Sequence, residues 1–158
     1  MTGLHPSCRT VNDILAANGL PGRVRILGDA APTARAAAEQ IGCPVGAIAN
    51  SLIFITDAST PLLIMTSGAH RVDVAKVGLE LGTSLHRAPA EFVREHTGQP
   101  IGGVAPIGHP QPIPTVVDVA LAEFEELWAA GGIPHAVFPI SYPDLLTLTG
   151  GNEIRVAD

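Results

Sequence analysis

The chain has 158 residues, of which 46% are hydrophobic, and a formal net charge of −6 from 15 acidic and 9 basic residues. This length suits one domain with a sizeable core and is too short for two, so we expect residues 1–158 to form a single domain. Lys and Arg residues are not clustered, which argues against a protein that grips a long nucleic-acid backbone but allows one that captures only a nucleic-acid end.

Hydropathy and cysteine content predict the cellular compartment. The apolar runs fall well short of the ~18 residues of a membrane-spanning helix. The N-terminal residues show no basic segment followed by an apolar core, which predicts that there is no secretory signal. Two cysteines, Cys8 and Cys43, are too few for a disulfide framework. We therefore expect a cytoplasmic protein that does not bind a membrane.

In the first half of the chain, the pattern predicts two helices and then a pair of strands. Thr10 can N-cap the first helix, and Pro32 can open the second. In order, the predicted elements are a helix over residues 11–18, a strand over 24–27, a helix over 33–41, and strands over 47–55 and 61–66. A short turn joins the last two strands, so they should form an antiparallel hairpin at the centre of the sheet.

The second half interleaves short helices and strands. Asp73 can N-cap the first helix, and Pro89 can begin the next. The predicted order is a helix over residues 74–81, a strand over 84–87, helix 90–96, strand 114–119, helix 121–130, strand 135–140, helix 143–148 and strand 153–156. Because the central hairpin argues against an all-parallel sheet, we expect a mixed α/β (α+β) fold. Its sheet should be largely antiparallel, curved or barrel-like, and flanked by short helices.

Residues 97–110 interrupt this pattern. They hold four of the 17 glycines and three of the 14 prolines, so they form neither a regular helix nor a central strand. Gly102 and Gly103 leave two consecutive amides without side-chain cover, which suits binding of a carbonyl oxygen or an anion. A tight turn that needs positive φ accounts for the same two residues, so both interpretations stay open.

Asn50 is the most informative polar residue of the predicted hairpin. It lies between Ile48 and Ile53, where an unpaired amide costs about 1–3 kcal/mol. Either its side chain pairs with backbone, or it faces a cavity that residues 97–110 also line.

Other chemistry finds little support in the sequence. The six histidines show no metal-binding spacing, and there is no dinucleotide or phosphate-loop motif, so we predict neither a metal nor a cofactor. Ser51 and Ser67 lack the context of a nucleophile elbow. His70 and His109 each allow a place in the site or in a surface turn.

Four segments, taken in order, resemble the YbaK/prolyl-tRNA synthetase-associated domain family of aminoacyl-tRNA editing domains. They are GAIANSLIF (46–54), SGAHRVD (67–73), TGQPIGGVAPIG (97–108) and the Val117-Asp118 pair. The resemblance runs from about residue 33 to residue 150. It implies a mixed α/β domain with a mainly antiparallel, barrel-like sheet. It also implies hydrolysis, without a metal, of the ester between a wrong amino acid and the 3′ end of tRNA.

The resemblance assigns roles to two parts of the chain. Residues 102–106 match the G-x-x-x-P loop that contacts the terminal adenosine and the ester. Hydrolytic members carry a lysine on the central strand, and Asn50 occupies that position, where an amide can donate a hydrogen bond but brings no charge. The predicted function is a free-standing aminoacyl-tRNA deacylase that supports translation fidelity. The alternative is a non-catalytic member that binds an aminoacyl or adenosine-like small molecule or the tRNA 3′ end.

The predicted site has two groups of residues. The predicted catalytic residues are Asn50, Gly102 and Gly103. The predicted substrate-binding residues are Ile48, Ser51, Ser67, Gly68, His70, Val104, Ala105, Pro106 and Gly108. The expected partner is the acceptor end of aminoacyl-tRNA or a small-molecule analogue, and a homodimer is compatible with the sequence. The identity of the amino acid depends on pocket dimensions, which the sequence leaves open.

Overall fold

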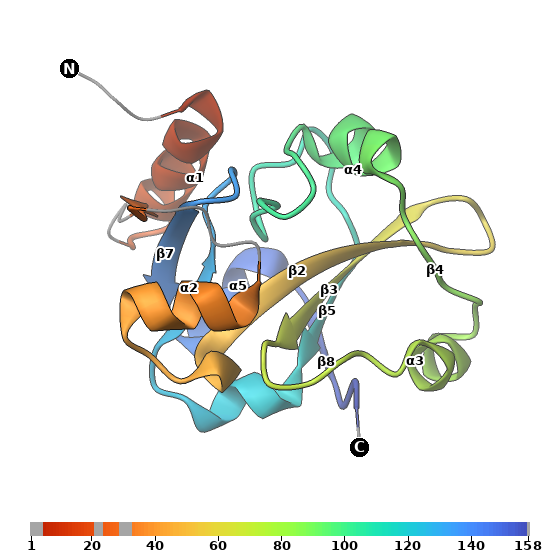
Figure 1. Cartoon of the computed structure of the whole chain (residues 1–158). Helices are drawn as coiled ribbons and strands as arrows, with labels where there is room; N and C mark the ends of the chain where they lie inside the picture. Colours follow the sequence, from red (N-terminus) through yellow and green to blue (C-terminus); the bar gives the residue numbers. More distant parts are fainter. Residues whose placement is uncertain (1–4, 21–23, 29–32, 158) are drawn as a thin grey trace.

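The computed structural model describes residues 5–20, 24–28 and 33–157 (Figure 1). Its α-helices are α1 (Pro6–Ala17), α2 (Ala34–Ile41), α3 (Val74–Leu81), α4 (Ala90–Thr97) and α5 (Tyr142–Thr149). Its strands are β1 (Arg25–Ile26), β2 (Ile48–Ile55), β3 (Pro61–Ser67), β4 (His86–Arg87), β5 (Thr115–Asp118), β6 (Leu127–Ala130), β7 (Ala136–Ile140) and β8 (Asn152–Ile154). None of the helices in these ranges has the length and apolar character needed to cross a membrane.

The strands form one mixed sheet with β2 and β3 in its middle. The order is β1-β7-β6-β2-β3-β5-β8, and β4 also pairs with β2. The pairs β1–β7, β6–β7, β2–β3 and β2–β4 are antiparallel, whereas β2–β6, β3–β5 and β5–β8 are parallel. The path is open at both ends, so the sheet is not a closed barrel. The predicted mixed α/β fold and its central hairpin are confirmed.

Helices cover both faces of this sheet. Side chains alternate between the two faces along its central strands, so each strand contributes to the packing on both sides. Ala49 and Ile53 of β2 belong to the larger buried cluster, which also holds residues of α1, α4, α5 and the loop that follows α4. On the opposite face, Ile48 packs with α2 and Phe54 packs with α3. The central strand β2 therefore lies between two layers of helices.

Local capping explains the helices that were predicted correctly. The hydroxyl of Thr33 accepts a hydrogen bond from the amide of Ala36 at 3.1 Å and so begins α2. The carboxylate of Asp73 accepts one from the amide of Lys76 at 3.1 Å and begins α3. Both helices end at a glycine in the left-handed conformation. The proposed start at Pro32 lies outside the described residues.

The start of the first helix is a correction. We expected Thr10 to cap it, but His5 is the N-cap, and its Nδ1 accepts a hydrogen bond from the amide of Ser7 at 3.1 Å. Pro6 occupies the first helical position, where its missing N–H costs nothing. The hydroxyl of Thr10 instead donates to the carbonyl of Pro6 at 3.1 Å, inside the helix.

The predicted helix over residues 121–130 is wrong. A short 3₁₀ helix, Val119–Glu123, is followed by the strand β6, which pairs with β2 and β7. The spacing of Leu121, Phe124, Leu127 and Trp128 imitates a helical period, but Leu127 and Ala129 are buried at alternate positions, as in a strand. The correction matters for the cavity described in the next subsection, because the end of β6 forms one of its walls.

Candidate active site

One edge of β2 is only partly paired. β6 pairs with it at Ile48 and Ala49, and β4 pairs with it at Phe54 and Ile55. Residues 50–53, which lie between these points, have a strand partner on the β3 side alone. At about 3.3 Å per residue, the gap between β6 and β4 is roughly 13 Å long.

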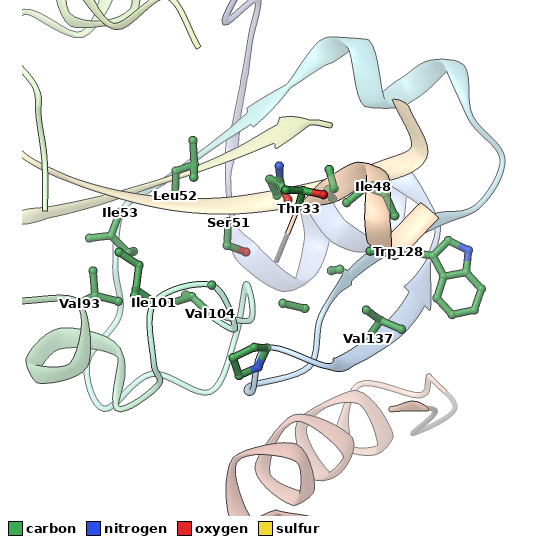
Figure 2. Close-up of a pocket in the computed structure, with 18 of the residues that line it drawn as sticks. Thr33, Ile48, Ser51, Leu52, Ile53, Val93, Ile101, Val104, Trp128 and Val137 are labelled. Carbon is green, nitrogen blue, oxygen red and sulfur yellow. The ribbon is translucent and has the colours of Figure 1, made fainter. Parts of the chain in front are cut away.

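A cavity of about 270 Å³ occupies this gap. In Figure 2, β2 runs along one side of it, the loop with Ile101 and Val104 lies opposite, and β7 with Val137 closes the far end. Consecutive residues of β2, whose side chains point to both faces of the sheet, line it along this edge. Seven alanines contribute to the lining: Ala34, Ala37, Ala49, Ala88, Ala129, Ala130 and Ala136.

Few polar side chains line this space among the described residues. They are Thr33, Asn50, Ser51 and Arg87. Arg87 is the one ionisable side chain that lines the cavity within the described ranges. Its guanidinium carbon lies 5.8 Å from the centre of the Phe54 ring, a cation–π distance, and the residue is exposed. The cavity thus combines a neutral interior with a single positive charge.

The side-chain amide of Asn50 is available to a ligand. Asn50 is half-buried on β2, opposite Thr66 of β3. Its side chain takes part in none of the hydrogen bonds found among residues 5–20, 24–28 and 33–157. It lines the same cavity as Gly102, so the structure brings together two of the three predicted catalytic residues.

The loop after α4 is held in shape by the side chain of Gln99, which is 2% exposed. Its Oε1 accepts a hydrogen bond from the amide of Ala105 at 2.7 Å, and its Nε2 donates to the carbonyl of Ile107 at 3.3 Å. Nε2 of His109 lies 2.8 Å from the carbonyl oxygen of Ala105. The loop is therefore braced from within, without regular secondary structure.

The two glycine amides of this loop differ. The amide of Gly103 donates to the carbonyl of Pro100 at 3.0 Å, so it already has a partner, contrary to our expectation. Gly103 also lies so close to the next turn that a Cβ there would approach the backbone of Ile133 to 2.4 Å and that of Pro134 to 2.6 Å. Gly102 has a φ of 88°, and its amide makes no hydrogen bond with any described residue. Gly102 is thus the glycine whose amide can face a ligand.

Three predicted binding residues lie at the end of β3, away from the cavity lining. Buried Asp118 accepts a hydrogen bond from the amide of Ser67 at 3.0 Å and lies 2.5 Å from Nε2 of His70. The hydroxyl of Ser67 donates to the carbonyl of Gly46 at 2.8 Å. A Cβ on Gly68 would come within 2.7 Å of the carbonyl oxygen of Val45. This network joins β3 to β5 and to the turn before β2.

The remaining predicted residues divide between the lining and the interior. Ile48, Ser51 and Val104 line the cavity with Asn50 and Gly102. Four others do not line it, namely Gly103, Ala105, Pro106 and Gly108. Ala105 and Pro106 are buried, and a Cβ on Gly108 would lie 3.4 Å from Thr10 of α1.

Several lining residues escaped prediction because they come from elements distant in sequence. Thr33 caps α2, Val93 lies on α4, and Trp128 and Val137 lie on β6 and β7. Arg87 could have been noticed, since it ends a predicted strand and is one of only nine basic residues. Nothing local marks the others, because the sheet pairing brings them together.

Comparison with known proteins gives consistent results. The family model described as "Aminoacyl-tRNA editing domain" matches residues 29–148. The uncharacterised protein YwhH of Bacillus subtilis (strain 168) is 30% identical over 113 residues, which are 72% of each chain.

Two solved structures are also similar. One, described as a candidate trans-editing enzyme for prolyl tRNA synthetase, has a TM-score of 0.92, 38% identity and coverage of 99% of each chain. Another, the hypothetical protein APE2540, has a TM-score of 0.86 and 28% identity, with 94% of this chain and 99% of that chain covered.

Proposed function

Because the chain belongs to the aminoacyl-tRNA editing domain family, we propose that it hydrolyses the ester bond between an amino acid and the 3′ end of a mischarged tRNA. The observation that carries the proposal is the cavity at the open edge of β2. The unpartnered amides of Asn50 and Gly102 line this one space. Two neutral donors that line one cavity suit an ester carbonyl, which gains negative charge during hydrolysis.

The chemistry we propose uses water as the nucleophile. Water adds to the ester carbonyl carbon, the bond between that carbon and the ribose oxygen breaks, and the leaving oxygen takes the proton that the water gives up. Within residues 5–20, 24–28 and 33–157, none of the lining residues is a carboxylate, histidine or cysteine that could act as base or nucleophile. The protein would therefore contribute positioning and hydrogen bonds to the developing oxyanion.

Arg87 has a separate proposed role, at the mouth of the cavity. An exposed guanidinium forms charge-assisted hydrogen bonds with phosphate oxygens. The nearest phosphate of a bound acceptor end belongs to its terminal nucleotides. We assign Arg87 to this phosphate, so that the tRNA end is held while the aminoacyl group enters the cavity.

The size and lining of the cavity favour a small, uncharged amino acid. About 270 Å³ is little room, and the one charged side chain among the described lining residues, Arg87, is assigned here to a phosphate. A similar structure is described as a candidate trans-editing enzyme for prolyl tRNA synthetase. We therefore choose tRNA for proline as the first substrate to test.

The test is a deacylation panel at enzyme excess. The tRNA for proline is charged with alanine, serine, cysteine, threonine or proline, and loss of each ester is followed over time. We expect hydrolysis of at least one non-cognate ester well above the rate without enzyme, and slow hydrolysis of the prolyl ester. Full retention of every ester would sink the proposal.

One observation favours a second candidate function, binding without turnover. Asn50 is neutral where hydrolytic members of the family carry a lysine, so stabilisation of an oxyanion should be weaker than with a charged donor. Titration with an amide-linked aminoacyl-adenosine separates the two functions. Binding of this analogue together with an inactive deacylation panel would support a binding module, and turnover would exclude it.

A further inference from the structure

The main-chain groups of Ser51 point into the gap in the sheet. In an antiparallel pair, successive residues direct their N–H and C=O groups alternately toward and away from the partner strand. The amide of Gly68 donates to the carbonyl of Ile48 at 2.8 Å, so the even-numbered residues of β2 bond to the β3 side. The amide of Ala88 donates to the carbonyl of Ile53 at 3.2 Å, so the odd-numbered residues face the other edge. Ser51 belongs to the odd-numbered set.

Neither flanking strand reaches Ser51 on that edge. The register of β2 with β6 ends at Ala49 and Ala129, and the register with β4 begins at Phe54 and Arg87. On the other side, Ser51 is paired in register with Met65 of β3. The N–H and C=O of Ser51 therefore form an open position of a ladder, at the wall of the cavity.

We propose that this open position binds the aminoacyl group itself, in the manner of one residue of an added strand. The α-amino group donates to the carbonyl of Ser51, and the ester carbonyl accepts from its N–H in addition to the donors of Asn50 and Gly102. In a hydrogen-bonded antiparallel pair, two residues exchange both bonds in this way, and an aminoacyl ester has its donor and acceptor at the same spacing. The assignment rests on the proposed function, and it names the main chain of Ser51 as the group that binds the aminoacyl part of the substrate.

The residues around Ser51 support recognition of the aminoacyl group by main-chain atoms. Among the described residues the cavity lining has no carboxylate, so the oxygens that these residues offer to an α-amino group are neutral. The hydroxyl of Ser51 donates to the sulfur of Met65 at 3.2 Å, which leaves the main chain as the free polar part of this residue. The gap of roughly 13 Å beside residues 50–53 also leaves room for an acyl group at Ser51.

The first experiment uses two non-hydrolysable probes. One is 3′-deoxy-3′-(L-alanylamido)adenosine, and the other is its 3′-propionamido counterpart, which lacks only the α-amino group. We expect the alanyl probe to bind the full chain at least about tenfold more tightly, since one buried hydrogen bond is lost in the other. Equal affinities, or no binding of either probe at millimolar concentration, would overturn the assignment.

Amide hydrogen exchange gives a direct readout. At saturation with the alanyl probe, exchange of the Ser51 amide should slow by about tenfold or more, because it acquires an acceptor. The amide of Leu52, which already faces β3, serves as the internal control. An unchanged Ser51 exchange rate at saturation would contradict the proposal whatever the affinity.

Two variants refine the test. Ser51→Pro removes the N–H but no bond to β3, so the hairpin should persist, as proline is tolerated where the N–H faces away from a partner. Ser51→Ala keeps the N–H and should bind the alanyl probe at least about tenfold more tightly than Ser51→Pro. Equal binding by the two variants counts against the proposal. If Ser51→Pro fails to fold by circular dichroism, the exchange rate in the unmodified chain decides.

Failure of this inference is distinguishable from failure of the proposed function. Protection of Ser51 with an inactive deacylation panel rejects the hydrolase and leaves the aminoacyl site standing. Hydrolysis that accelerates alanyl and propionyl esters equally, relative to their rates without enzyme, rejects the Ser51 contact and leaves the hydrolase standing.

Discussion

At the scale of single residues, the side-chain amide of Asn50 can be tested through its charge. We expect Asn50→Ala to lower kcat/KM by about 10- to 100-fold, since a donor to the oxyanion is lost. Asn50→Lys should raise it above the unmodified value, because a charged donor is stronger. Single-turnover deacylation measures both. Asn152, which is exposed on β8, offers a control in Asn152→Ala, and an unaltered rate in Asn50→Ala would remove Asn50 from the site.

His109 should make the stability of the protein depend on pH. Burial lowers its pKa below the ordinary value of 6.5, and the hydrogen bond to Ala105 offsets this only in part. As pH falls through 6.5, the unfolded chain therefore takes up more protons than the folded one, and the free energy of unfolding decreases.

The matched variant is His109→Gln, which keeps a donor for the carbonyl of Ala105 but does not titrate. Between pH 7.5 and 5.5, the unmodified chain should lose up to about 1 kcal/mol more unfolding free energy than this variant in urea titrations. The same pH dependence in both proteins would show that His109 does not titrate in this range.

At the scale of elements, the loop after α4 depends on its close contact with the turn between β6 and β7. We expect Gly103→Ala to lower the free energy of unfolding by about 1–3 kcal/mol, because its Cβ would overlap the backbone of Ile133 and Pro134. Deacylation should fall as well, since the loop also carries Gly102. Urea unfolding checks the first effect. A Cβ on Gly28 meets nothing within 4 Å, so Gly28→Ala is the control, and equal losses would contradict the packing argument.

The elements that were predicted correctly carry their signals locally. Asp73 and Thr33 cap their helices through neighbouring amides, and the short turn before Pro61 fixes the β2–β3 hairpin. The strand β6 was missed because Leu127 and Trp128 lie at helical spacing with Leu121 and Phe124. Its pairing with β2 and β7, far away in sequence, decides its conformation.

The residues of the candidate site also divide into those with a local sequence signal and those placed by long-range pairing. Gly102 and Asn50, which line the cavity, could be singled out from the sequence, because a glycine-rich apolar loop and an amide in an apolar strand are unusual in themselves. Ser67 and His70 belong to one of the matching segments, residues 67–73, yet they bond to Asp118 and do not line the cavity. The gap beside Ser51 could not be predicted, because it depends on where β6 stops pairing and β4 starts.

At the scale of the whole molecule, the charge of −6 limits how much of a tRNA the protein can hold. We expect deacylation of an acceptor-stem minihelix to match that of full-length tRNA within about threefold. The slope of log K against log salt concentration should be only about −1 to −2, as for one or two phosphate contacts. Fluorescence titration between 50 and 200 mM salt measures it, and a slope steeper than about −4 would indicate a larger contact surface.

The open edge of β2 also bears on self-association. Unpaired strand edges are templates onto which other chains add, and proteins commonly cover or shorten them. Here the loop with Gly102 and Val104 and the start of α2 line the cavity beside residues 50–53, and only this short stretch of the β2 edge between β6 and β4 is unpaired. A short unpaired stretch is a poor template for another chain, so the arrangement that creates the cavity also limits edge-to-edge association.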